Sequence, residues 1–137
     1  FETVFPVIAN ILHSGLKNIA AFNTYALKKI CAYLGITTKI IETSSIYNNS
    51  HLKSQERILD ICFKENATHY INPIGGMEIY NGDAFNNNNI KLNFLKTDKI
   101  EYKQYNDAFI PSLSVIDVMM FNSPDDINKM LNKYELI

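Results

Sequence analysis

The sequence predicts an α/β fold in which helices are layered on a small, mainly parallel sheet, in a Rossmann-like arrangement. Helical and strand-like stretches alternate along the chain, and a helical stretch separates the first two predicted strands, as in a parallel crossover connection. The chain has 137 residues, 47% of them hydrophobic, which suits one domain. We therefore expect residues 1–137 to form a single α/β domain. Because the chain begins at Phe1, without an initiator Met and inside an apolar run, we expect this domain to be incomplete.

The predicted helices follow from apolar residues at helical spacing. Residues 4–21 show this spacing, and Gly15 indicates either two short helices or one bent helix. Residues 26–34 predict a further helix, with Asn23 or Thr24 as its N-cap and Gly35 directly after its end. Later helices are predicted over residues 52–64 and 112–121, and the second of these is expected to be buried. One helical turn is predicted within residues 83–89. The last predicted helix starts at Ser123-Pro124-Asp125-Asp126 and includes Tyr134 in its apolar stripe.

Three strands are predicted. Residues 37–43 are β-branched and short, residues 68–72 are stopped by Pro73, and residues 90–95 alternate between apolar and polar. The alternation places the third strand at an edge of the sheet with one face in water. Residues 44–51 are predicted as a polar loop, and residues 100–110 as either extended chain or loop.

Composition excludes several classes of protein. The net charge is -1 and the pI about 6.3, so the electrostatic basis for nucleic-acid binding is missing. No uninterrupted apolar stretch approaches the roughly 20 residues of a membrane span, and signal-peptide anatomy is absent. Cys31 and Cys62 lie in apolar helical patterns and are predicted to be buried thiols in a reducing compartment. We expect a cytoplasmic protein.

Two loops after predicted strands contain candidate binding residues. Ser44 follows the first strand, and Lys53 and Arg57 lie four apart at the start of the next helix. Hydroxyl, ammonium and guanidinium groups at this edge of a parallel sheet would suit a phosphate or carboxylate, although a solvated helix face explains the two cations about as well. Gly75-Gly76 follows the second strand and would allow close backbone approach to a ligand, but ordinary turns also use paired glycines.

Asp117 is the other candidate, because an acid flanked by apolar residues is either on the wet side of its helix or buried with a partner. Ser114 lies three residues earlier on the same face. A structural tie is the more common role for such an acid, while a perturbed acid can also serve a site. His13, His51 and His69 lack metal-ligand spacing, so no metal site is predicted.

Three stretches resemble the WbqC-like protein family of bacteria: 53–60 (KSQERILD), 68–80 (THYINPIGGMEIY) and 102–122 (YKQYNDAFIPSLSVIDVMMFN). The resemblance extends from about residue 26 to the C-terminus, and its specificity lies in the order and spacing of the stretches. It implies that the chain is the C-terminal portion of such a protein, since the family's N-terminal QPxFFPxxGY-type motif is absent here.

The resemblance also implies a role in the biosynthesis of O-antigen or another surface polysaccharide, where a WbqC-like protein would transfer glycine or another amino acid to a sugar. ATP or an activated acyl donor would then be consumed. The alternative is a non-catalytic accessory protein of a polysaccharide assembly complex that binds a nucleotide or a sugar. A third interpretation is that the polar residues only tie loops to the core. Asp117 and Gln104 would orient the amine. The binding residues that the resemblance implies are Ser44, Lys53, Arg57, Asn72, Gly75, Gly76, Tyr80, Tyr102 and Ser114.

Overall fold

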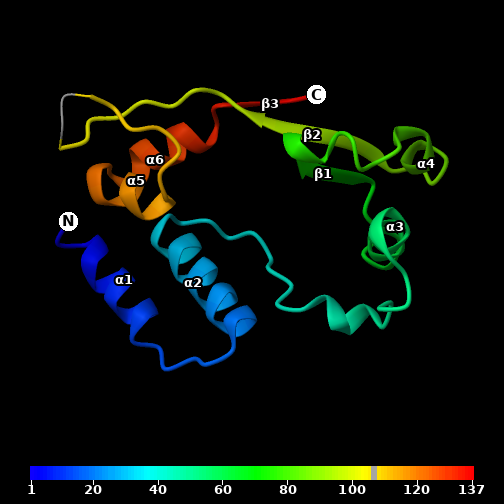
Figure 1. The fold of residues 1–137 in the computed structure, drawn as a ribbon, viewed down its shortest axis with the longest axis horizontal. Coiled ribbons are helices and arrows are strands. Elements are labelled where there is room, and N and C mark those ends of the chain that lie inside the picture. Colours follow the sequence, from blue (N-terminus) through cyan, green and yellow to red (C-terminus); the bar gives the residue numbers. More distant parts are fainter. Residues whose placement is uncertain (106–107) are drawn as a thin grey trace. The chain divides into compact units, whose positions relative to one another are not determined.

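The computed structural model describes residues 1–105 and 108–137, and it divides the chain into two compact units (Figure 1). We call Phe1–Glu42 with Lys99–Lys133 the helical unit, and Thr43–Asp98 with Tyr134–Ile137 the sheet unit. Asn106 and Asp107, within the segment predicted as extended chain or loop, lie outside the described residues.

The helical unit contains α1 (Val4–Leu12), α2 (Ile19–Tyr33), α5 (Val115–Phe121) and α6 (Pro124–Leu131). Residues 4–21 are thus divided between two helices, with Gly15 at a φ of 70° in their connection. The predicted caps Asn23 and Thr24 are wrong, because the side chain of Asn18 accepts hydrogen bonds from the amides of Ala20 and Ala21 and starts α2 earlier. Gly35 follows α2 at a φ of 71°, as predicted.

The core of the helical unit joins all four helices. Its buried residues are Val4, Leu34, Met119 and Ile127. Only Met119 of α5 is buried, so the prediction of a buried helix holds for one face of α5. The start of α6 is confirmed, because Ser123 Oγ accepts a 3.2 Å hydrogen bond from the amide of Asp126 and Pro124 is the first helical residue.

The sheet unit contains the short 3-10 helix η1 (Ser44–Tyr47), α3 (Ser54–Lys64), β1 (His69–Pro73), the 3-10 helix η2 (Ile74–Gly76), α4 (Gly82–Asn86), β2 (Lys91–Thr97) and β3 (Tyr134–Leu136). Its three strands form a mixed sheet in the order β1-β2-β3: β1 pairs with β2 in parallel, and β3 is antiparallel to β2 (Figure 1). Among the described residues, then, the chain is a mixed α/β protein.

One strand prediction and one strand position are wrong. Residues 37–43 form no strand, since β-branched residues favour a strand only where another strand supplies hydrogen bonds, and no described strand pairs with them. The strand predicted over residues 90–95 is confirmed as β2, which begins one residue later at Lys91, but it is the central strand and not an edge, because β3 covers its second side. Tyr134, predicted in the last helix, is instead the first residue of β3.

The core of the sheet unit lies where α3 and α4 meet the strands. Phe85, Cys62 and Ile90 are buried there, and Ile58, Leu59, Tyr70, Tyr80 and Leu92 pack around them. Both cysteines are free thiols, with Cys62 buried and Cys31 half-buried. The packing of Ile58 and Leu59 fixes the rotation of α3, and this rotation decides where the polar residues on its other faces lie.

Candidate functional site

Most of the predicted site residues fall into three clusters. In the sheet unit, Ser44 and Arg57 form the Arg57 cluster with Asn49, and Asn72, Gly76 and Tyr80 form the Tyr70 cluster with Tyr70. In the helical unit, Tyr102, Gln104 and Asp117 form the Asp117 cluster.

The Arg57 cluster holds a guanidinium group between a hydroxyl and an amide. Arg57 lies in the first turn of α3, its Nη2 donates to Ser44 Oγ at 2.9 Å, and its Nε donates to Asn49 Oδ1 at 3.1 Å. A guanidinium group has five N–H donors, so three remain for a ligand. Among the described residues no carboxylate pairs with Arg57.

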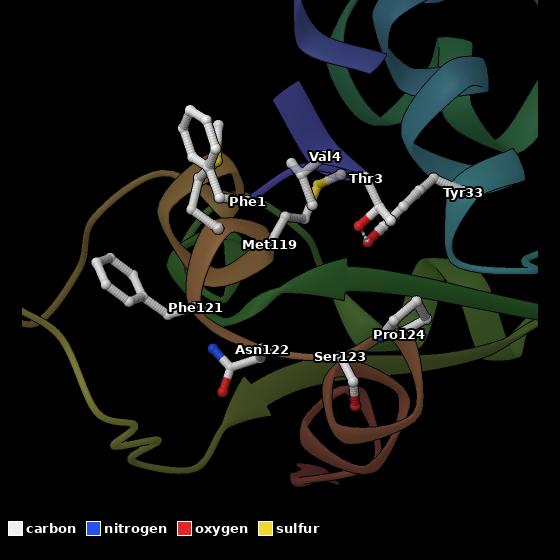
Figure 2. A pocket seen from close by; sticks show the side chains of 10 residues that line it. Phe1, Thr3, Val4, Tyr33, Met119, Phe121, Asn122, Ser123 and Pro124 are labelled. Carbon is white, nitrogen blue, oxygen red and sulfur yellow. Dashed lines mark hydrogen bonds between the residues drawn. The ribbon is translucent and has the colours of Figure 1, made fainter. Parts of the chain in front are cut away.

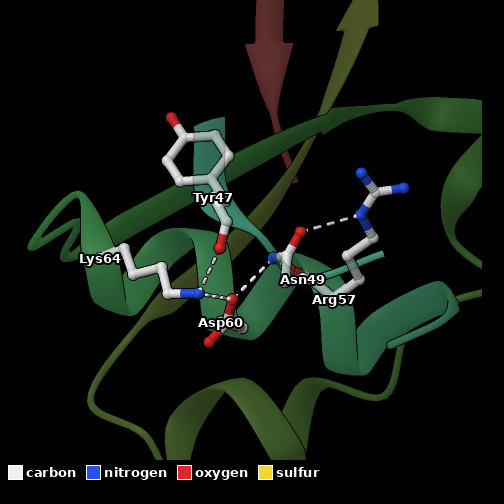
Figure 3. Close-up of polar contacts among 5 residues, drawn as sticks. All are labelled: Tyr47, Asn49, Arg57, Asp60 and Lys64. Atoms are coloured by element: carbon white, nitrogen blue, oxygen red, sulfur yellow. Dashed lines mark hydrogen bonds and ion pairs between the residues drawn. The ribbon is translucent and has the colours of Figure 1, made fainter. Parts of the chain in front are cut away.

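Asn49 links Arg57 to Asp60, which lies further along α3 (Figure 3). It is 1% exposed, and its Nδ2 donates to Asp60 Oδ2 at 2.6 Å. Lys64 Nζ donates to the same oxygen at 2.7 Å, and this bond, followed by the bond from Asn49, lowers the pKa of Asp60. The charge of Asp60 is therefore balanced by Lys64, while the charge of Arg57 is left available. Sequence analysis missed Asn49, because in a chain rich in asparagine nothing marks this one.

Lys53 does not join this cluster. It precedes α3 in an extended conformation as the N-cap residue, so the helical spacing that predicted a shared face with Arg57 does not apply to it. Its side chain is exposed, and no contact with Ser44 or Arg57 is found in the described part of the chain. The start of α3 is anchored instead by Gln55, whose Oε1 accepts a hydrogen bond from the amide of Asn81 at 2.6 Å.

The Tyr70 cluster is built of half-buried phenols. Asn72 Nδ2 donates to Tyr70 Oη at 2.7 Å, and Tyr70 Oη donates to Tyr80 Oη at 3.4 Å. The ring of Tyr70 stacks on Phe85 with 5.5 Å between centroids. Burial, with a smaller contribution from the hydrogen bond with Tyr80, raises the pKa of Tyr70 to about 12. At neutral pH the phenol of Tyr70 is therefore uncharged.

The two adjacent glycines differ in their surroundings. Gly76 is buried, and a Cβ atom there would lie 2.2 Å from Asn72 Oδ1. Gly75 is exposed, and no heavy atom comes within 4 Å of its Cβ position. The absence of a side chain at Gly76 therefore makes room for Asn72, a packing reason that differs from the ligand approach that the sequence suggested.

The Asp117 cluster ties a loop to α5. Tyr102 Oη donates to Asp117 Oδ2 at 2.6 Å, and Gln104 Nε2 donates to the same oxygen at 3.1 Å. Gln104 also pairs with the backbone of Ile110, through its Oε1 at 2.8 Å and its Nε2 at 3.1 Å. Burial and the bond to Asp117 raise the pKa of Tyr102. The second oxygen, Asp117 Oδ1, has no hydrogen-bond partner among the described residues.

Ser114 has a structural role at the start of α5. Its Oγ accepts a hydrogen bond from the amide of Ile116 at 3.3 Å, which makes it the N-cap of α5. It does not bond to the carboxylate of Asp117. Asp117 is half-buried in the first turn of α5, where the helix N-terminus favours a negative charge, and its side-chain hydrogen-bond partners are a phenol and an amide.

Hollows in the helical unit lie beside this cluster. One of about 330 Å³ is lined by Asp117 and Gln104 together with Phe1, Tyr105, Ile110, Leu113, Met120 and Phe121. Another, of about 270 Å³, lies between the first residues of the chain, Tyr33 and the connection from α5 to α6 at Asn122 and Ser123 (Figure 2). It contains none of the predicted site residues and was missed by the sequence analysis.

Metal and membrane signatures were sought in the same residues. In residues 1–105 and 108–137, no three His, Cys, Asp or Glu side chains come together as they would around a metal ion. None of the helices described combines the length and the apolar character needed to cross a membrane.

Comparison with known proteins identifies the family. The model of the WbqC-like protein family matches residues 1–129, so the chain belongs to this family. It is 28% identical over 106 residues to an uncharacterized protein of Mycobacterium tuberculosis, Rv1507c. That match covers 77% of this chain and 45% of the relative, so the chain spans less than half of that relative's length. No solved structure matches the chain significantly.

Proposed function

We propose that this protein acts in the biosynthesis of a bacterial surface polysaccharide such as O-antigen, and that it binds an anionic sugar or nucleotide-sugar at the Arg57 cluster. The resemblance to WbqC-like proteins supports the pathway. One observation supports the proposal of an anionic ligand. Arg57 is held by Asn49 and Ser44, three of its N–H donors remain unused, and no described carboxylate pairs with it. We place the protein in the cytoplasm, because Cys31 and Cys62 are free thiols, the state that reducing compartments maintain.

The ligand group would be a carboxylate or phosphate oxygen. Arg57 can offer two parallel N–H donors to such a group, a geometry that lysine cannot supply. Ser44 is exposed and adds a hydroxyl at the same place. Nothing in this arrangement requires catalysis, so a non-catalytic binding protein of a polysaccharide assembly complex is consistent with it.

Calorimetric titration with a nucleotide-sugar uronate tests this proposal. Because hydrogen bonds to charged groups contribute about 1.5–3 kcal/mol, Arg57→Ala is expected to weaken binding roughly 10- to 100-fold. Ser44→Ala, which leaves the bond between Arg57 and Asn49 intact, should weaken binding less. Lys91→Ala removes an equal charge from an exposed position in the same unit and should leave affinity unchanged. Equal affinity for wild type and Arg57→Ala, with both folded by circular dichroism, would refute the proposal.

A second candidate function, transfer of an amino acid to a sugar, is favoured by Asp117. The sugar carboxyl group would first be activated with ATP, or would be supplied already activated in an acyl donor. The amine nitrogen would then attack the carbonyl carbon, so that a C–N bond forms, the bond to the leaving oxygen breaks, and the nitrogen gives up a proton. Asp117 Oδ1 can accept that proton, since Tyr102 and Gln104 hold only the other oxygen.

Mass spectrometry separates the two candidates. The protein is incubated with a nucleotide-sugar uronate, ATP and glycine or another amine, and the products are weighed. An aminoacyl transferase gives a sugar product heavier by one aminoacyl residue, and Asp117→Asn removes that product. Saturable binding without any product favours the binding protein and excludes transfer under these conditions.

A further inference from the structure

The hollow beside Asp117 combines one carboxylate with an apolar wall. Its volume of about 330 Å³ is at the lower end of the range of about 300–1,000 Å³ for small-molecule pockets. Asp117 and Gln104 supply its polar groups, and Leu113, Ile110 and Met120 are among the apolar residues around them. Such a wall with few convergent polar groups is typical of a ligand site.

We propose that this hollow binds a primary amine that carries an apolar side chain and no free carboxylate, as in the ester or amide of an apolar amino acid. The inference depends on the second candidate function, in which Asp117 receives an amine, and it specifies the class of that amine. The proposed amine differs from glycine, which has no side chain to fill the hollow.

The ammonium group is recognised by Asp117. Two donors to Oδ2, from Tyr102 at 2.6 Å and Gln104 at 3.1 Å, hold the carboxylate in one orientation. Oδ1 has no hydrogen-bond partner in the described part of the chain, and no Lys or Arg side chain described there forms an ion pair with Asp117. A ligand ammonium would supply both the donor and the positive charge.

The apolar wall selects the side chain. Leu113 and Ile110 are 46% and 50% exposed, so the wall retains apolar surface that a ligand can cover. Each buried methylene contributes an amount that corresponds to about fourfold in affinity. A branched four-carbon side chain that is partly covered should therefore tighten binding about 10- to 100-fold over a hydrogen atom.

The same wall disfavours a free carboxylate. The described residues that line the hollow include no cationic side chain, so a ligand carboxylate would lose water without gaining a cationic partner and would lie near the negative charge of Asp117. An ester or amide at that position carries no charge. The hollow should therefore prefer amino acid derivatives whose carboxyl group is blocked.

Binding of four probes to the folded chain tests the inference, measured by NMR titration at about pH 6, where α-amino groups are protonated. Leucine methyl ester is expected to bind most tightly. Glycine methyl ester lacks the side chain, free leucine has a carboxylate, and the methyl ester of 4-methylpentanoic acid lacks the amine. Each is expected to bind at least about tenfold more weakly.

Variants assign the site. Asp117→Asn keeps the shape of the side chain but removes its charge, and it should weaken leucine methyl ester binding at least about tenfold. Asp125→Asn makes the same change in charge at an exposed position of the same unit and should have no effect. Equal affinity for glycine and leucine methyl esters would overturn the apolar selection while leaving amine binding at Asp117 in place. Binding of no amine at all would overturn both, and equal binding of free leucine would overturn the exclusion of carboxylates.

Discussion

Substitution of Gly76 by alanine should destabilise the sheet unit through one contact. A Cβ atom at Gly76 would lie 2.2 Å from Asn72 Oδ1, closer than real Cβ contacts, and 3.0 Å from Asn72 Cγ, which is tighter than most of them. The side chain of Asn72 must then rotate away. In doing so it loses the 2.7 Å hydrogen bond that its Nδ2 donates to Tyr70 Oη.

The magnitude follows from that displacement. Loss of the hydrogen bond costs about 1 kcal/mol, and overpacking a filled site costs about 1–3 kcal/mol, with the lower end applying because a side-chain tip can move. Replacing glycine also lowers the conformational entropy of the unfolded chain, which stabilises the folded state by about 0.4–1 kcal/mol. We expect Gly76→Ala to lower the free energy of unfolding by about 1–2 kcal/mol.

Urea denaturation followed by far-ultraviolet circular dichroism measures this difference. Gly75→Ala is the matched control, because its Cβ would meet no heavy atom within 4 Å, and it should be neutral or slightly stabilising. In the double variant Gly76→Ala with Asn72→Ala, the steric cost should largely disappear. The reasoning would be refuted if Gly76→Ala were as stable as Gly75→Ala, or if the cost remained after Asn72 was truncated.

Two further predictions concern the Arg57 cluster. Asn49→Ala should cost about 2 kcal/mol of unfolding free energy, because the substitution removes the hydrogen bonds of a buried carboxamide to two charged groups. Asn86→Ala, at an exposed position of α4, should cost less than about 0.5 kcal/mol. Similar urea midpoints for both variants would contradict this. Because the pKa of Asp60 is lower in the folded chain than in the unfolded chain, ionised Asp60 stabilises the folded state. This stabilisation is fully present above the unfolded-state pKa of 3.8, and it is lost as the pH falls through the lower folded-state pKa. Lys64→Met should raise the pKa of Asp60 in a carboxyl NMR titration, and the free energy of unfolding should then decrease less as the pH falls. An unchanged pKa would exclude Lys64 as the main cause of the lowered pKa of Asp60.

Elements with strong local signals could be predicted from the sequence. The series Ser123-Pro124-Asp125-Asp126 starts α6 because each residue satisfies a requirement of a helix N-terminus within four positions. Gly35 ends α2 because the chain there needs a positive φ. These features depend only on neighbours in sequence, so an isolated stretch contains the information.

Elements that depend on a distant partner could not be predicted in this way. β3 has three residues, and it exists because Tyr134–Leu136 pairs with β2, far away in sequence. The same pairing places β2 at the centre of the sheet. Residues 37–43 have the composition of a strand but have no described partner strand. Strand propensity is largely a measure of fit to a sheet that must already be present.

The candidate site residues likewise combine a feature that the sequence shows with a feature that depends on residues brought together by folding. The sequence could mark Arg57 as unusual, since it is the only arginine in the chain, but it could not show which charges nearby are already balanced. Lys64, four residues after Asp60 on α3, takes up the carboxylate, and Asn49 then reaches Arg57 with a neutral amide. A carboxylate in place of that amide would neutralise the guanidinium group. The availability of Arg57 for an anionic ligand therefore depends on a neutral residue eight positions away whose side chain is buried, and only the folded structure shows this.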